Sequence, residues 1–381
     1  MRLSNLSPID DQESVVDLKI RQGKIESISP HDSSVSNSIV FDNAVVFPGL
    51  INSHDHLDFN LFPQLKVNVH YDYLDWGKAI HSNFKEEIDR INQIPDQLRG
   101  QWGILKNLIN GFTTVVDHSF HAHHPNGFVD VVGDFNFIHA IGTHKNWKLK
   151  LNNFLNHRDV MLHIGEGITE GMSDEIDQFI KWNLLGKSVI GIHCIAMNTK
   201  QAEHFKALVW CPDSNKFLFN KTAPIDQLKH HVTILFGTDS SLSASSLIWE
   251  HLKEARILQL LNDEELFHSL TANPARIFGL NNQLKENASA DLVIAKRKTG
   301  KNSWDNFYSI NPEDFLLIVN NGQIKLFDSS IEDQIDKSTM NELARIKYST
   351  SRKFIEKGAV LCIKELEKYQ VPLPLPISID E

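Results

Sequence analysis

Short apolar runs separated by turn residues occupy both ends of the 381-residue chain, whereas its middle alternates apolar runs with amphipathic stretches. The terminal runs lie at residues 15–47, 290–297 and 315–328, and the last contains Asn-Gly between two apolar segments. Alternating apolar and polar residues bounded by turn residues predict strands, and Asn-Gly predicts a hairpin turn. We expect these separated segments to form one small β domain.

Seven apolar runs between residues 48 and 284 are nearly continuous, as expected of strands that are buried on both faces. They are residues 49–54, 111–118, 135–141, 159–165, 188–194, 207–212 and 232–239. Helical patterns separate most of them, for example Leu98, Trp102, Leu105 and Ile109 at spacings of four, three and four. Repeated strand-then-helix order predicts an α/β fold with parallel strands, and its closed form is the eight-stranded TIM-type barrel.

An eighth strand is not evident from the pattern. Residues 142–158 have room for one helix but hardly for a further strand, so we expect either a reduced fourth strand or a distorted barrel there. The segment 337–368 is predicted to be helical, and 372–381 to be an extended tail. The resulting boundaries are 1–47 and 285–335 for the two β parts, 48–284 for the barrel, and 336–381 for a C-terminal helix and tail.

Composition narrows the class of protein. The net charge of -10 argues against a nucleic-acid or anionic-membrane partner. Three widely spaced cysteines suggest neither a disulfide framework nor a cysteine-rich zinc site, which fits a reducing cytoplasm. The first 20 residues lack a basic start followed by an apolar segment, and no run of about 18 apolar residues occurs. We therefore expect a cytoplasmic protein with no membrane span.

Two His-x-His triplets stand out among 19 histidines, although either could arise by chance. His54 and His56 close an apolar strand, where alternation places both side chains on one face and Asp55 on the other. His121 and His123 lie in a polar loop, which we interpret as solvated. By itself the first pair fits metal ligands and a polar core cluster equally well.

Other predicted strands also end in polar side chains. His163 ends one strand and is followed by Glu166, His193 ends another, and Asp239 ends the last. Catalytic groups of an α/β barrel gather at this end of the strands, and zinc or ferrous iron binds imidazole and carboxylate with a position left for water. One metal site would satisfy these buried polar groups together.

A second His-x-x-Glu pair provides a comparison for His163 and Glu166. His251 and Glu254 lie in a stretch with the pattern of an amphipathic helix. We interpret this pair as part of a solvated helix face.

Seven motifs, in this order, resemble the amidohydrolase superfamily, and within it the branch that holds cytosine and guanine deaminases. They are "PGLINSHDH", "GFTTVVD", "HIGEG", "CPDSN", "GTDSSLS", "LTANPARIFGL" and "ASADLVI". The resemblance covers residues 17–327. It implies a distorted (β/α)8 barrel with a small β-sandwich built from sequence on both sides of it.

The resemblance also implies a ligand set and roles. His54 and His56 on the first strand, His163 on the fifth and Asp239 on the eighth would hold one divalent ion, zinc or iron. Asp239 is the candidate base for a metal-activated water, and Glu166 would relay a proton to a leaving nitrogen. His193 would stabilise charge in the tetrahedral intermediate.

The sequence departs from the family in two places. Lys145, Lys148 and Lys150 lie where two-metal members carry a bridging group, so a second metal remains open. The loop after His56 is rich in aromatic residues, and Phe59, Phe62, Tyr73 and Trp76 are either substrate contacts or ordinary packing at the barrel mouth. His118 ends the second strand and is a further candidate substrate contact. Asp213 and Asn215 of "CPDSN" are expected to make turn hydrogen bonds.

We therefore expect a metal-dependent hydrolase of carbon–nitrogen bonds that deaminates a small nitrogen heterocycle. Hydrolysis of a cyclic amide, as in imidazolonepropionase-like relatives, is the alternative reaction. A catalytically silent barrel that binds a ligand is the alternative from another class. A small molecule is the expected partner, and a homodimer is left open.

Overall fold

The computed structural model describes residues 1–11, 13–34, 37–119, 127–298 and 302–380. Its central part is an α/β unit of two parallel sheets, with strand orders β5-β6-β7 and β12-β11-β10-β9-β8. The strands are β5 (Leu50–Asp55), β6 (Phe112–Asp117), β7 (Asp130–Val132), β8 (Asn136–Ala140), β9 (Val160–Ile164), β10 (Val189–His193), β11 (Ala207–Trp210) and β12 (Thr233–Phe236). Backbone hydrogen bonds from Thr238 and Asp239 to the His54 carbonyl join the end of β12 to β5.

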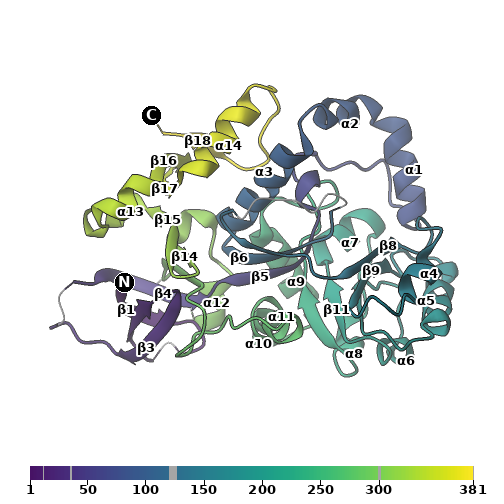
Figure 1. Ribbon diagram of the computed structural model, residues 1–381, viewed down its shortest axis with the longest axis horizontal. Coiled ribbons are helices and arrows are strands. Elements are labelled where there is room, and N and C mark those ends of the chain that lie inside the picture. The colour runs from purple at the N-terminus through teal and green to yellow at the C-terminus, as the bar shows by residue number, and fades with distance from the viewer. Residues whose placement is uncertain (12, 35–36, 120–126, 299–301, 381) are drawn as a thin grey trace.

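Helices follow most of these strands and cover them (Figure 1). They are α1 (Tyr73–Asn83), α2 (Lys85–Asn92), α3 (Asp96–Ile109), α4 (Trp147–Leu151), α5 (Glu170–Trp182), α6 (Thr199–Ala202), α7 (Pro212–Phe219), α8 (Ile225–Leu228), α9 (Ile248–Leu258), α10 (Asp263–Leu270) and α11 (Ala272–Phe278). The periodic residues Trp102, Leu105 and Ile109 of α3 are buried, which confirms the predicted helix. The seven predicted strands of this part of the chain are likewise all present.

The eighth parallel strand is not where we expected it. It is β7, the third along the chain, and residues 142–158 hold only the helix α4. The expectation of a reduced fourth strand is therefore wrong, because the fourth strand, β8, is formed by the run that we had counted as the third. At three residues, β7 is too short to have a recognisable period.

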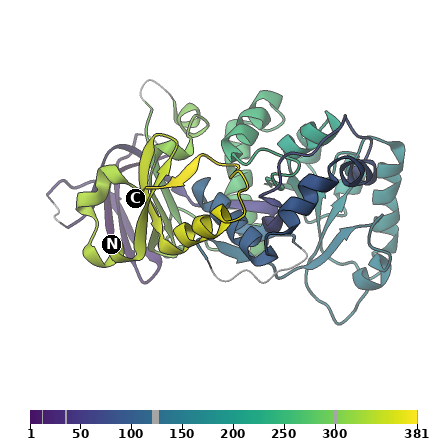
Figure 2. The same cartoon turned by 90° about the horizontal axis from the view of Figure 1, so that it is seen from above.

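The two ends of the chain share one ten-stranded sheet beside the α/β unit (Figure 2), where we had expected a two-sheet sandwich. Its order is β18-β16-β17-β15-β14-β13-β4-β1-β2-β3. The strands are β1 (Arg2–Pro8), β2 (Val16–Arg21), β3 (Lys24–Pro30), β4 (Ile39–Pro48), β13 (Leu292–Lys296), β14 (Phe315–Asn320), β15 (Gln323–Asp328), β16 (Leu343–Tyr348), β17 (Ser351–Glu356) and β18 (Ile377–Ile379). Because β4 leads through Gly49 into β5, this sheet anchors the start of the strand that carries His54 and His56.

The prediction of one helix over residues 337–368 is wrong. The segment contains α13 (Lys337–Glu342), the hairpin β16–β17 and α14 (Lys357–Glu367). Leu343, Ile346 and Tyr348 of β16 are buried while Arg345 and Lys347 are exposed, so this stretch has an alternating pattern that favours a strand. The hairpin extends the sheet at β15, and α14 lies beside α3 (Figure 1). Between β13 and β14 of the same sheet, the chain forms the short helix α12 (Ser303–Phe307).

Helix α3 approaches the 3-10 helix η1 (Leu57–Phe59) closely. A Cβ atom at Gly103 would lie 2.2 Å from the Leu57 carbonyl oxygen, so no larger residue fits there without backbone movement. Because η1 follows His56 directly, this contact fixes the loop that leaves the histidine pair. Among the described residues, no helix combines the length and the apolar character that crossing a membrane requires.

Candidate metal centre and active site

The ends of β5, β9 and β12 bring four of the predicted ligands together. His163 Nε2 lies 3.2 Å from His54 Nε2 and 3.3 Å from His56 Nε2. Asp239 Oδ1 lies 3.8 Å from the first of these histidines and 3.9 Å from the second. Donors about 2.0–2.1 Å from a tetrahedral zinc ion are about 3.3–3.4 Å apart, so this donor set fits such an ion with small adjustments.

Burial prepares the histidines to act as neutral ligands. The side chains of His54 and His163 are at most 5% exposed. Their burial, followed by the proximity of other imidazoles, lowers the pKa of both well below the usual histidine value. Metal ions bind neutral imidazole. Both groups are therefore in the ligand form at neutral pH.

Asp239 is held in place by two hydroxyl groups. Its Oδ2 accepts hydrogen bonds from Ser214 (2.8 Å) and Ser243 (2.7 Å), which leaves Oδ1 facing the histidines. Burial acts to raise the pKa of this carboxyl, but nearby imidazoles and the two hydroxyls outweigh it, and the pKa is lowered. The carboxylate form is therefore favoured, as a metal ligand requires.

Two of the site residues have a left-handed backbone. The φ angles of His193 and Asp239 are 67° and 57°. Such angles are uncommon for residues other than glycine, and strained residues of this kind concentrate at functional sites. Here the conformation occurs at the carboxyl ends of β10 and β12, where the backbone leaves each strand and changes direction.

The motif "CPDSN" does more than shape a turn. It begins helix α7, and Asn215 Oδ1 accepts a hydrogen bond from His193 Nδ1 at 2.8 Å. This bond leaves His193 Nε2 directed to the site, 3.7 Å from Glu166 Oε1. The expected turn role of Asn215 is therefore wrong, and Ser214 and Asn215 are positioning residues that the sequence reasoning missed. Asp213 instead accepts a hydrogen bond from the Ser245 backbone.

Glu166 is buried beside the cluster, with 6% of its surface exposed. Burial, and then the neighbouring Asp239 carboxylate, raises the pKa of Glu166 well above its ordinary value. A raised pKa keeps a proton on a carboxyl group that would otherwise be ionised at neutral pH. The side chain can therefore donate a proton to a group in the cavity.

A cavity of about 400 Å³ opens over this cluster, within the size range of small-molecule sites. Its polar side is formed by His56, His139, His163, Glu166, His193 and Asp239. The apolar part of its lining includes Phe59, Phe62, Tyr73, Trp76, Ile80 and Leu242. The aromatic residues of the loop after His56 thus face the cavity. No lysine or arginine is among the described residues that line it.

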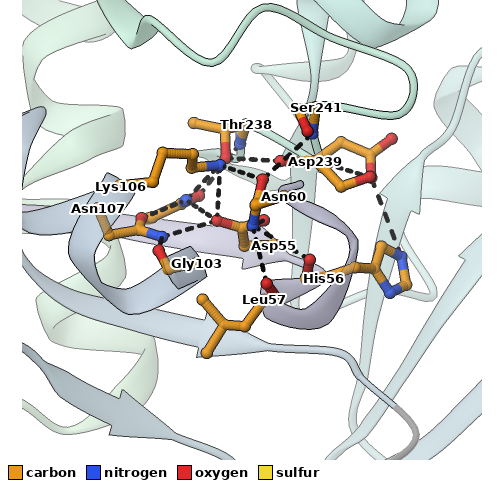
Figure 3. A network of polar contacts seen from close by, with 12 residues as sticks. Asp55, His56, Leu57, Asn60, Gly103, Lys106, Asn107, Thr238, Asp239 and Ser241 are labelled. Carbon is orange, nitrogen blue, oxygen red and sulfur yellow. Dashed lines mark hydrogen bonds and ion pairs between the residues drawn. The ribbon is translucent and has the colours of Figure 1, made fainter. Parts of the chain in front are cut away.

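A buried ion pair lies behind the histidine pair (Figure 3). Lys106 Nζ is 3.0 Å from Asp55 Oδ2, and both side chains are at most 2% exposed. Asn60 bridges the pair, since its amide donates to Asp55 Oδ1 and its Oδ1 accepts from Lys106. The same Oδ1 accepts from the Ser241 backbone, so the network joins β5 to the loop that carries Asp239. Asp55 therefore faces away from the metal centre, as alternation predicts.

Lys106→Met is expected to lower the free energy of unfolding by about 3–5 kcal/mol, because it leaves the Asp55 carboxylate buried without its cation. Asp55→Asn combined with Lys106→Met should recover most of this loss, since no buried charge then remains. Chemical denaturation of the purified variants measures both. Lys85→Met, which removes an exposed ion pair with Asp89, is the control and should cost at most about 1 kcal/mol. Equal effects of the two single changes would contradict the assignment.

The remaining predicted residues lie as follows. His118 is 4% exposed and packs against the ring of His163, but it is not among the residues that line the cavity. His251 is wholly buried and contacts the Ser245 carbonyl at 2.7 Å, so its interpretation as part of a solvated face is wrong. Lys148 and Lys150 lie in α4 and Lys145 just before it, and none of the three lines the cavity. His121 and His123 lie outside the described residues.

A model of the amidohydrolase family matches residues 158–325. At 22% identity, the chain is similar to a 5'-deoxyadenosine deaminase of Methanothrix thermoacetophila over 73% of this chain and 81% of that one. It is 26% identical to a 5-methylthioadenosine/S-adenosylhomocysteine deaminase of Caldicellulosiruptor saccharolyticus, a match that spans 49% of this chain and about half (51%) of that protein.

Two solved structures have a similar fold. One is the atrazine chlorohydrolase TrzN of Arthrobacter aurescens with zinc, at a TM-score of 0.66 and 18% identity, which covers 85% of this chain and 94% of that one. The other is an adenosine deaminase of Xanthomonas campestris with bound zinc, at a TM-score of 0.67 and 14% identity. This match covers 96% of this chain and 98% of that one. The family match covers less than half of the chain, and the two solved structures show a similar fold.

Proposed function

We propose that the protein is a metal-dependent deaminase of a neutral amino-substituted nitrogen heterocycle, with a 6-aminopurine nucleoside as the favoured class. Water replaces the exocyclic amino group, so that the products are the ring carbonyl compound and ammonia. The observation that carries the proposal is Glu166, a buried carboxyl with a raised pKa on the cavity wall beside the donor set. The deaminases among the similar proteins support the same reaction.

Each of the site residues has a separate role in this reaction. When bound to His54, His56, His163 and Asp239, a divalent metal supplies a water molecule of lowered pKa. Asp239 is the base that accepts the proton released from that water. Glu166 donates a proton towards the nitrogen side of the substrate. Burial lowers the pKa of His193, which favours the neutral ring; since Nδ1 donates to Asn215, Nε2 accepts a hydrogen bond and so holds the hydroxyl group of the tetrahedral intermediate.

The wall of the cavity favours a neutral substrate with an apolar substituent. No described lining residue is a lysine or arginine, and residues 120–126 contain neither type. Burial, and then the proximity of His56, lowers the pKa of His139 to about 4, so this ring adds no positive charge at neutral pH. A phosphate or carboxylate group would be desolvated there without a lysine or arginine to pair with it. Phe59 and Trp76 are proposed to contact the planar ring of the substrate.

An ammonia assay tests this proposal. The zinc-loaded protein should release ammonia from 5'-deoxyadenosine or 5'-methylthioadenosine. It should act on adenosine 5'-monophosphate with a kcat/KM lower by roughly 100-fold or more, because of the unpaired phosphate. A cyclic imidazolone included in the same screen separates the alternative reaction, which opens a ring without releasing ammonia. Ring opening alone would contradict deamination.

We also propose that the two parallel sheets form one distorted eight-stranded barrel. The hydrogen bonds from Thr238 and Asp239 to the His54 carbonyl support closure between β12 and β5. Between β7 and β8 no ladder is formed in the described residues, which makes this the open side of the distortion.

A further inference from the structure

His118 is a buried histidine whose ring nitrogens have no hydrogen-bond partner among the described residues. It follows β6 directly and is 4% exposed. Burying a polar group without a hydrogen-bond partner destabilises a protein. Packing against Phe137, at a centroid separation of 4.6 Å, gives neither nitrogen a hydrogen bond. Within the described part of the chain, both ring nitrogens are therefore available to a ligand.

The ring of His118 lies about as far from the rings of His54, His56 and His163 as those three rings lie from one another. Its ring centroid lies 5.4, 5.6 and 4.7 Å from those of His54, His56 and His163. The separations among those three are 4.9, 4.9 and 5.3 Å. Ligand atoms of His54, His118 and His163 all lie within 4.8 Å of one another. His118 is thus a fourth imidazole around the same point.

We propose that His118 is a further protein ligand of the metal ion, in addition to His54, His56, His163 and Asp239. One ion, rather than two, accounts for the geometry. His163 Nδ1 is occupied by a hydrogen bond to the His139 carbonyl at 2.8 Å, so His163 offers only Nε2. That same atom lies 3.3 Å from His56 Nε2 in the first donor set. Both sets therefore converge on one position.

The additional ligand leaves room for catalysis. His56, His163 and Asp239 line the cavity but His118 does not, so it approaches the ion from the buried side. The coordination position that faces the cavity stays open for water, as a catalytic site requires. A site with four imidazoles and one carboxylate suits a divalent first-row transition ion such as zinc or ferrous iron. The inference rests on the metal site of the proposed function but does not depend on deamination.

X-ray absorption spectroscopy of the zinc-loaded protein tests the proposal. The wild-type spectrum should require four imidazole ligands, and that of His118→Gln should require three. Competition with a chelator should give a zinc affinity for His118→Gln that is lower by about 10- to 100-fold. The matched control is His251→Gln, which removes another wholly buried histidine, in helix α9, and should keep four imidazoles.

Three imidazoles in the wild-type protein would overturn the proposal, as would an unchanged ligand count and affinity in a folded His118→Gln variant. The wild-type count decides by itself if that variant does not fold. None of these readouts involves turnover, so a protein with four imidazoles that releases no ammonia would contradict the proposed function and support this inference.

Discussion

Glu166→Gln is expected to lower kcat by about 10²- to 10⁴-fold, the usual contribution of a general acid or base. Glutamine keeps the size of the side chain but cannot deliver a proton to the leaving nitrogen. The metal should stay bound, because Glu166 is not in the donor set. Steady-state ammonia release, with metal analysis of the same sample, measures both quantities.

Glu254→Gln is the control for this change. Glu254 belongs to the other His-x-x-Glu sequence of the chain and pairs with Lys216 rather than with the site. It should leave kcat unchanged. If Glu166→Gln kept more than about a tenth of the wild-type kcat while its metal content was normal, Glu166 would not be the proton donor.

His163→Ala should abolish both metal binding and turnover. Its Nε2 lies 3.2 Å from His54 Nε2 and 3.3 Å from His56 Nε2, so its loss removes a central donor of the buried site. The fall in zinc affinity should exceed the roughly 10- to 100-fold typical of residues that only support a ligand. Elemental analysis after dialysis and the ammonia assay are the measurements.

His204→Ala, a change of an exposed histidine, should affect neither property. Full turnover by a metal-free His163→Ala protein would refute the role of the metal, whereas a normal metal content would refute the ligand assignment.

The elements predicted best from the sequence are those with a strong and sufficiently long pattern. The runs that became β9 and β10 are buried on both faces, and helix α3 repeats its apolar residues over three turns. The strand β7 has three residues and could not be recognised. The prediction of a helix over the hairpin β16–β17 is wrong because charged residues alternate with apolar ones in β16, a pattern that favours a strand.

The candidate site could be located because its chemistry lies at the ends of recognisable strands. The structure brings together His54, His56, His163 and Asp239, which lie up to 185 residues apart in the chain. Residues so far apart in sequence meet only because of the topology of the fold. The positioning residues were harder to find, because the hydrogen bond from His193 to Asn215 joins the end of β10 to helix α7 and has no local sequence signal. Lys106 was similarly hidden inside the apolar pattern of α3.

The measurement that tests the central claim most directly is the metal content and ammonia release of one wild-type preparation given 5'-deoxyadenosine, before chelation, after chelation and after zinc is restored. The account predicts about one ion per chain, ammonia equal to the substrate consumed, loss of turnover on chelation and its return with zinc. Turnover that persists without metal would contradict it, as would a zinc-loaded, folded protein that releases no ammonia from any neutral amino-substituted heterocycle.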